Sequence, residues 1–220
     1  MLEKSVLVDG WTLNERLKGL AATATKLVFT DTPIPEGVLS ADVSEGWNKS
    51  IRAWLDGATF YISSLTKGEK VPANKDCGGM FEGCPFEEID VSMLDVTDVK
   101  SMDRMFADCS ELVSLDLSGW EVSYVTDMDA MFWGCKKLAT LSGVTDWDVS
   151  RVGWMSRMFA GCESLEDLDL SGWDVELVDY YEDFNAGAPG VTEPDWVYLQ
   201  TRDTLNELFD ELTPEDLAGF

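Results

Sequence analysis

Residues 115–135 read LDLSGWEVSYVTDMDAMFWGC, and a closely similar stretch, LDLSGWDVELVDYYEDF, begins at residue 168. The dipeptide Met-Phe recurs through this region at intervals of 25, 26 and 27 residues. The four dipeptides begin at Met80, Met105, Met131 and Met158, and a cysteine follows each at one offset, at Cys84, Cys109, Cys135 and Cys162. A self-similar pattern of this length indicates a repeat architecture, so the repeat decides the fold.

The spacing of apolar residues within a unit predicts the shape of one repeat. In the second unit, Leu115 and Leu117 alternate as they do on one face of a short strand. Apolar residues then recur at every third position from Val122 to Met131, which suits an extended or 3₁₀-like return. The segment TDMDAMF predicts one short helical turn. Strand, return and turn form a coil that buries its apolar side only by stacking on the next coil.

The pattern MFxGCxxLxxLDLSGWDVSxVxxM, spread over about residues 79–186, resembles the bacterial leucine-rich-repeat surface proteins of the BspA-like kind. The expected fold is therefore an α/β solenoid, a right-handed leucine-rich-repeat stack of short parallel strands joined by short helical or 3₁₀ turns. The resemblance also implies a binding role, because typical members are exported proteins that adhere to or contact host molecules. In the third unit, which is one residue longer, Gly143 is the expected site of a bulge.

Three domains are predicted. Residues 1–66 are expected to form an N-terminal α/β cap, with a helix that a capping box at Thr12 and Glu15 introduces and a hairpin that turns at Asp56-Gly57. Residues 67–187 hold the repeats, with units starting near residues 80, 105, 131 and 158.

Residues 188–220 form the third predicted domain, a C-terminal helical cap. Apolar residues in it recur at the spacing of one face of a helix, at Leu205, Leu208, Phe209 and Leu212. Acidic residues occupy the other face, so the helix is expected to be amphipathic and acidic.

The composition limits the class of function. The chain has 42 acidic and 16 basic residues, a formal net charge of −26, and no histidine. This charge repels nucleic acid and anionic membranes and favours a protein partner with a basic surface. The lack of histidine removes histidine-based triads and the common zinc ligand sets. We therefore predict no enzymatic activity, no cofactor and no metal site, and we expect the repeat cysteines to be buried free thiols.

The beginning of the sequence bears on location. It has no apolar run long enough for a secretory signal, and no stretch approaches the 18 apolar residues of a membrane-spanning helix. These features predict a cytoplasmic protein. If the chain is a trimmed piece of a longer protein, the bacterial cell surface is the alternative.

Two rows of carboxylates are the first candidates for a partner-binding site. The strand row consists of Asp90, Asp116 and Asp169, with Ser142 in the third unit, and the second row, after the tryptophans, consists of Asp95, Glu121, Asp148 and Asp174. Stacked carboxylates repel one another, so solvent screening, a basic partner or cations must offset the repulsion. No loop concentrates the six to eight oxygen ligands that calcium needs.

Aromatic residues outside the apolar template are further candidates. Tyr124, Trp133 and Trp154 do not fall on the repeated core positions, and such residues often anchor protein interfaces. Two functional hypotheses follow. The first is a non-enzymatic protein-binding module built on the repeats. The second is an acidic inhibitor encoded by a phage or mobile element, which mimics nucleic acid in the basic groove of its target, as anti-restriction or anti-CRISPR proteins do.

Overall fold

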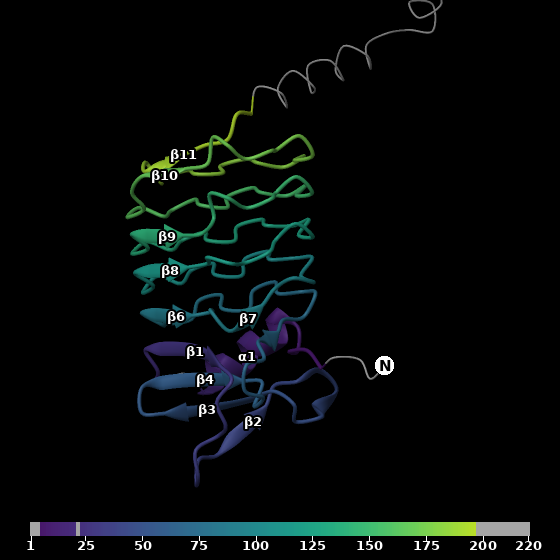
Figure 1. Ribbon diagram of the computed structural model, residues 1–220. Coiled ribbons are helices and arrows are strands. Elements are labelled where there is room, and N and C mark those ends of the chain that lie inside the picture. The colour runs from purple at the N-terminus through teal and green to yellow at the C-terminus, as the bar shows by residue number, and fades with distance from the viewer. Residues whose placement is uncertain (1–4, 21–22, 197–220) are drawn as a thin grey trace, which may run out of the picture.

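The structure is a computed structural model, which describes residues 5–20 and 23–196. Figure 1 shows successive coils of the chain stacked on an N-terminal unit of helix and strands. The predicted C-terminal helix falls on residues 197–220, outside the described residues.

The N-terminal unit begins with one helix, α1 (Gly10–Leu20). Its first turn is capped by Asp9, whose carboxylate accepts the backbone N–H of Thr12 at 2.9 Å and the hydroxyl of Thr12 at 2.7 Å. The predicted capping box is therefore wrong, because Thr12 lies inside the helix and Asp9 takes the capping position. The strands of the unit are β1 (Lys26–Thr30), β2 (Ser40–Asp42), β3 (Arg52–Asp56), β4 (Thr59–Ser63) and β5 (Val71–Pro72), with a 3₁₀ turn at Glu45–Trp47.

Strands β3 and β4 form the hairpin that the sequence predicted around Asp56-Gly57. They pair antiparallel with Asp56 opposite Thr59, which leaves Gly57 and Ala58 as the loop. Gly57 has a φ of +59°, a conformation that favours glycine in such tight connections.

The repeats contribute six very short strands. They are β6 (Glu88–Asp90), β7 (Leu94–Asp95), β8 (Ser114–Asp116), β9 (Thr140–Ser142), β10 (Leu168–Asp169) and β11 (Val191–Thr192). One seven-stranded sheet has the order β2-β3-β4-β1-β6-β8-β9, antiparallel from β2 to β4 and parallel from β4 to β9. Two further sheets pair β5 with β7 and β10 with β11. The large sheet ends at the third unit, where the sequence holds its extra residue.

Over the described residues, the predicted α/β leucine-rich-repeat solenoid is wrong, because the repeats form short strands of a mixed sheet and almost no helix. Strand β1 pairs with β6, so one mixed sheet runs from the N-terminal unit into the repeats. The residues around each Met-Phe dipeptide form turns and no helix. The physical reason is visible in the second unit, where Arg104 and Asp108 both have a φ of +54°. Left-handed residues so close together prevent a right-handed helix from forming.

Backbone hydrogen bonds between neighbouring coils hold the stack together. The N–H of Phe106 donates to the carbonyl of Met131 at 2.9 Å, and the N–H of Phe132 donates to the carbonyl of Met158 at 2.9 Å. The next such bond joins Phe159 to Phe184 at 2.8 Å, so Phe184 begins a fifth turn of the stack. The repeated Met-Phe dipeptide does not mark this turn, because phenylalanine stands where the other units have methionine.

The interior consists of columns of identical side chains. The rings of Phe106, Phe132 and Phe159 stack at centroid distances of 5.6 and 5.4 Å, and a second column holds Trp120, Trp147 and Trp173. All five cysteines are buried and free, which confirms the prediction of buried thiols. The thiol of Cys135, for example, donates to the carbonyl of Phe106 in the preceding coil at 3.0 Å. Burial raises the pKa of Cys162 to about 12, so this thiol is inert as a nucleophile near neutral pH.

Candidate interaction surface

The strand row lies on the exposed surface of the repeats, as predicted. Asp90, Asp116 and Asp169 are exposed, and Asp116 lies opposite Ser142 in the pairing of β8 with β9. Each of the three carboxylates accepts the backbone N–H of the serine two residues later, at 3.0, 2.9 and 3.0 Å respectively. Hydrogen bonds from Ser118 lower the pKa of Asp116, and the backbone N–H of Ser171 does the same for Asp169.

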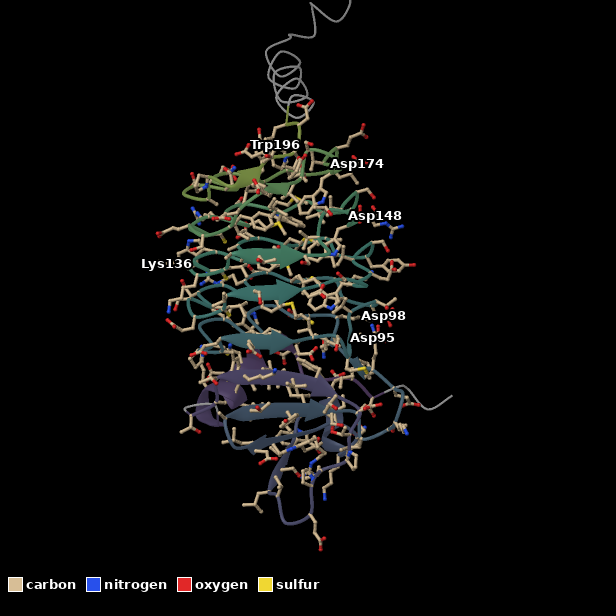
Figure 2. The ribbon with its side chains drawn as sticks, turned by 60° about the vertical axis from the view of Figure 1, so that its left-hand side comes forward. Asp95, Asp98, Lys136, Asp148, Asp174 and Trp196 are labelled. Atoms are coloured by element: carbon tan, nitrogen blue, oxygen red, sulfur yellow. The ribbon has the colours of Figure 1, made fainter. Side chains whose placement is uncertain are left out.

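The second row has the same local geometry in three of its four members. The carboxylates of Asp95, Asp148 and Asp174 each accept the backbone N–H of the residue two positions later, at 3.2 Å in each case. The pKa of Asp148 is lowered by the hydroxyl and backbone N–H of Ser150. Figure 2 shows Asp95, Asp148 and Asp174 along one side of the stack, with Lys136 on the other side.

These hydrogen bonds give the repeated aspartates a structural role. A side-chain oxygen that bonds the backbone two residues on forms an Asx turn, which bends the chain at the corner of a coil. Asp90 also has a cation nearby, because Lys26 pairs with Glu88 at 2.7 Å, and after Glu88 the charge of Asp90 contributes to the raised pKa of Lys26. Most of the aspartates predicted to bind a partner are therefore explained by the fold alone.

The three predicted aromatic anchors lie in different surroundings. Trp133 is half-buried, with the guanidinium of Arg104 5.0 Å from its ring centroid. Tyr124 is 45% exposed, and the ammonium of Lys100 lies 4.3 Å from its ring centroid. Trp154 is 46% exposed and stacks on Tyr180, which is 50% exposed, with the ring centroids 6.2 Å apart and the planes at 5°.

The Trp154–Tyr180 stack belongs to a column that the sequence analysis did not assemble. Isolated parallel bridges place five residues in register on successive coils: Asp76, Ser101, Asp127, Trp154 and Tyr180. A neighbouring column two residues further along the chain holds Asp103, Asp129, Ser156 and Glu182. The residues between the two columns, such as Met102 and Met128, are fully buried, so the column residues face outward. We call these two columns together the bridge face.

Three carboxylates of the bridge face differ electrostatically from those of the two rows. Asp103, Asp127 and Asp129 are half-buried. Burial, followed by repulsion from Asp127 and Asp129, raises the pKa of Asp103 to about 6. Burial is also the largest cause that raises the pKa of Asp127 and Asp129. A face of this kind gains electrostatic stabilisation when a positive group approaches it.

The sequence contains signals for two parts of this face. Tyr180 follows Trp154 by one repeat period, and a search for the fifth unit would have aligned the two residues. Asp127 and Asp129 occur in the quoted segment itself, but the sequence alone gives no measure of their burial. The burial of each carboxylate depends on side chains one coil away.

Residues 109–196 match the family model described as "Mycoplasma protein of unknown function, DUF285". This match spans less than half of the chain, and it includes Asp127, Trp154 and Tyr180 but excludes Asp76 and the N-terminal unit. No curated protein and no solved structure matches the chain.

Residues 5–20 and 23–196 contain neither a candidate membrane-spanning helix nor a candidate metal site. Within these ranges, no helix has both the length and the apolar character needed to cross a membrane. The same part of the chain holds no group of three or more histidine, cysteine or acidic side chains arranged to hold a metal ion.

Proposed function

We propose that this protein is a non-enzymatic protein-binding module that binds a partner with a basic surface. The observation that carries this proposal is the bridge face, where half-buried carboxylates lie next to an exposed pair of aromatic rings. Aromatic residues with one side exposed often anchor interfaces, and carboxylates around them select a basic partner.

Electrostatic repulsion within this face supports a binding role for it. The carboxylates of Asp103, Asp127 and Asp129 repel one another and are partly desolvated, which destabilises the folded chain at neutral pH. A basic partner offsets this cost when it binds. The resemblance of the repeats to BspA-like surface proteins supports the same role, because typical members of that family bind other molecules.

The alternative is an inhibitor that mimics nucleic acid. It would use the second row, whose members Glu121, Asp148 and Asp174 are exposed one per coil. The Asx-turn hydrogen bonds account for most of these positions, so the bridge face is the better candidate. The alternative predicts that the partner is a nucleic-acid-binding protein and that nucleic acid displaces this protein from it.

The test is capture followed by reconstitution. The immobilised protein is incubated with bacterial lysate, captured proteins are identified, and each is then purified and titrated by calorimetry at low and moderate salt. We expect a basic protein whose affinity falls as salt rises above about 0.1 M, because the attraction between exposed charges decays over about 10 Å at that salt concentration and over shorter distances at higher salt. Partners that are neutral and insensitive to salt would overturn the proposal, as would failure of every captured protein to bind when purified.

A further inference from the structure

Three aromatic side chains on the surface of this protein are covered by its own cations. The guanidinium of Arg16 lies 4.3 Å from the ring centroid of Trp47. Arg104 lies over Trp133, and Tyr124 has both Lys100 and Arg151 within 5.2 Å of its ring centroid. A cation over an aromatic face contributes about 0.5–1 kcal/mol at an exposed site. The fold therefore uses cation–π contacts repeatedly where a ring reaches solvent.

The Trp154–Tyr180 stack has no such cation within the part of the chain that the structure describes. Of the two arginines closest to Trp154 in sequence, Arg151 lies over Tyr124. Arg157 pairs with Asp183 at 3.8 Å and also attracts the carboxylates of Asp129 and Glu182, so it partly offsets their charge. Trp154 and Tyr180 are each about half exposed as residues. An exposed pair of large aromatic side chains of this kind marks an interaction site on many proteins.

Carboxylates surround this pair along both columns of the bridge face. Asp127 precedes Trp154 in register, one coil below it. Glu182 lies on the same coil as Tyr180 and accepts the hydroxyl of Ser156 at 2.9 Å. Asp129 also interacts with Ser156, which lies between it and Glu182 in the neighbouring column. A positive group against the rings is thus within the electrostatic field of these carboxylates.

We propose that the Trp154–Tyr180 stack, with Asp127, Asp129 and Glu182, binds an arginine side chain from a basic segment of a protein partner. Arginine fits better than lysine because its planar guanidinium stacks on an aromatic face while its N–H groups donate to carboxylates in the same plane. At the Trp154–Tyr180 stack, the partner's arginine supplies the cation. At Trp47, Tyr124 and Trp133, the protein's own arginine and lysine side chains supply it. This inference rests on the proposed function and names its site and ligand.

The test uses three short peptides with the intact protein. A tetra-arginine peptide, a tetra-lysine peptide and a tetra-citrulline peptide, in which the guanidinium is replaced by a neutral group of similar shape, are titrated by calorimetry at low salt. We expect the arginine peptide to bind more tightly than the lysine peptide and the citrulline peptide to show no binding. Equal binding of arginine and citrulline peptides, or no binding of the arginine peptide, would overturn the inference.

Paired variants locate the contact. Trp154→Leu should weaken binding of the arginine peptide by on the order of tenfold. Tyr124→Leu is the matched control, because the ring of Tyr124 already carries Lys100 and Arg151, and it should leave the affinity within about twofold. Trp154→Phe keeps an aromatic face and should retain part of the affinity even if the leucine variant folds poorly. Equal losses in Trp154→Leu and Tyr124→Leu would contradict the assigned site.

The outcomes separate this inference from the proposed function. If a purified basic partner binds Trp154→Leu as tightly as the unaltered protein, the arginine site is wrong and the binding role stands. If the arginine peptide binds through Trp154 but the protein captures no basic partner that binds when purified, the site stands and the proposed function fails.

Discussion

The strand row and the bridge face are both acidic, yet the same residue type behaves oppositely in them. In the strand row, hydrogen bonds from the backbone and side chain of a following serine lower the pKa of Asp116. In the bridge face, burial and neighbouring carboxylates raise the pKa of Asp103 to about 6. Asp116 therefore stabilises the fold as an anion, whereas Asp103 is destabilising when it is ionised. The comparison teaches that a repeated aspartate is a candidate for binding only where the fold does not already use its charge.

Among substitutions near the strand row, Gly143→Ala should cause the largest loss of folding stability. Gly143 has a φ of +83°, and a Cβ atom there would lie 2.3 Å from the backbone nitrogen of Ser118. That nitrogen donates the hydrogen bond that Asp116 accepts. We expect a loss of about 2–3 kcal/mol in the free energy of unfolding, measured by urea denaturation, because backbone strain and the close contact add. Gly119→Ala is the control: its φ is +80° but nothing lies within 4 Å, so it should cost less.

A pair of substitutions at Asp116 tests the turn role directly. Asp116→Ala should lower the free energy of unfolding by about 1 kcal/mol, because the N–H of Ser118 loses its acceptor. Asp116→Asn should be nearly neutral, since an amide oxygen accepts the same bond. Both variants are compared by thermal and urea unfolding at pH 7. If Asn destabilises as much as Ala, the charge of Asp116 matters more than its hydrogen bond.

Asp103→Asn should change the free energy of unfolding in the opposite direction and stabilise the protein. The folded pKa of Asp103 is raised from 3.8 to about 6, so its favourable contribution to stability is present below pH 3.8 and is lost as pH rises through about 6. Removal of the charge should therefore raise the free energy of unfolding at pH 7, by about 1 kcal/mol once solvent screening of this half-exposed group is included. The gain should vanish at pH 4. A loss of stability at pH 7 would contradict the assigned repulsion.

The smallest expected effect is the pH dependence of peptide binding. At pH 5 the carboxyl group of Asp103 is mostly protonated, and at pH 7 it is ionised. Binding of the tetra-arginine peptide should therefore be about threefold tighter at pH 7, since one more nearby carboxylate attracts the cation. The dependence should disappear in Asp103→Asn. If the affinity of the unaltered protein for the peptide does not change between pH 5 and pH 7, Asp103 does not influence the site.

The repeated apolar positions could be predicted from the sequence, while the conformation between them could not. Met105, Phe106 and Cys109 are fully buried, as their recurrence in the four predicted units indicated. The helical turn predicted after Thr126 is absent, because Ala130 takes a left-handed conformation with a φ of +51°. No sequence pattern marks this choice, since alanine favours a right-handed helix when only local propensity is considered.

The candidate site was predictable in its parts but not as a whole. Trp154 and Tyr124 were both expected as anchors, yet the structure places cations over one and leaves the other stacked on Tyr180. The difference arises from Lys100 and Arg151, which lie on the coils before and after Tyr124. Contacts between coils decide which ring is covered, and such contacts are absent from any local stretch of sequence.

The sequence by itself determined that the chain stacks on itself with like residues in register, because a period of 25–27 residues sets the offset at which buried columns align. It also determined the excess of negative charge. Only the tertiary structure decided which carboxylates serve turns and which repel one another. The reason is that the solvation and hydrogen bonding of a side chain depend on atoms of the neighbouring coil. Those atoms are one repeat away in the sequence but adjacent to the side chain in space.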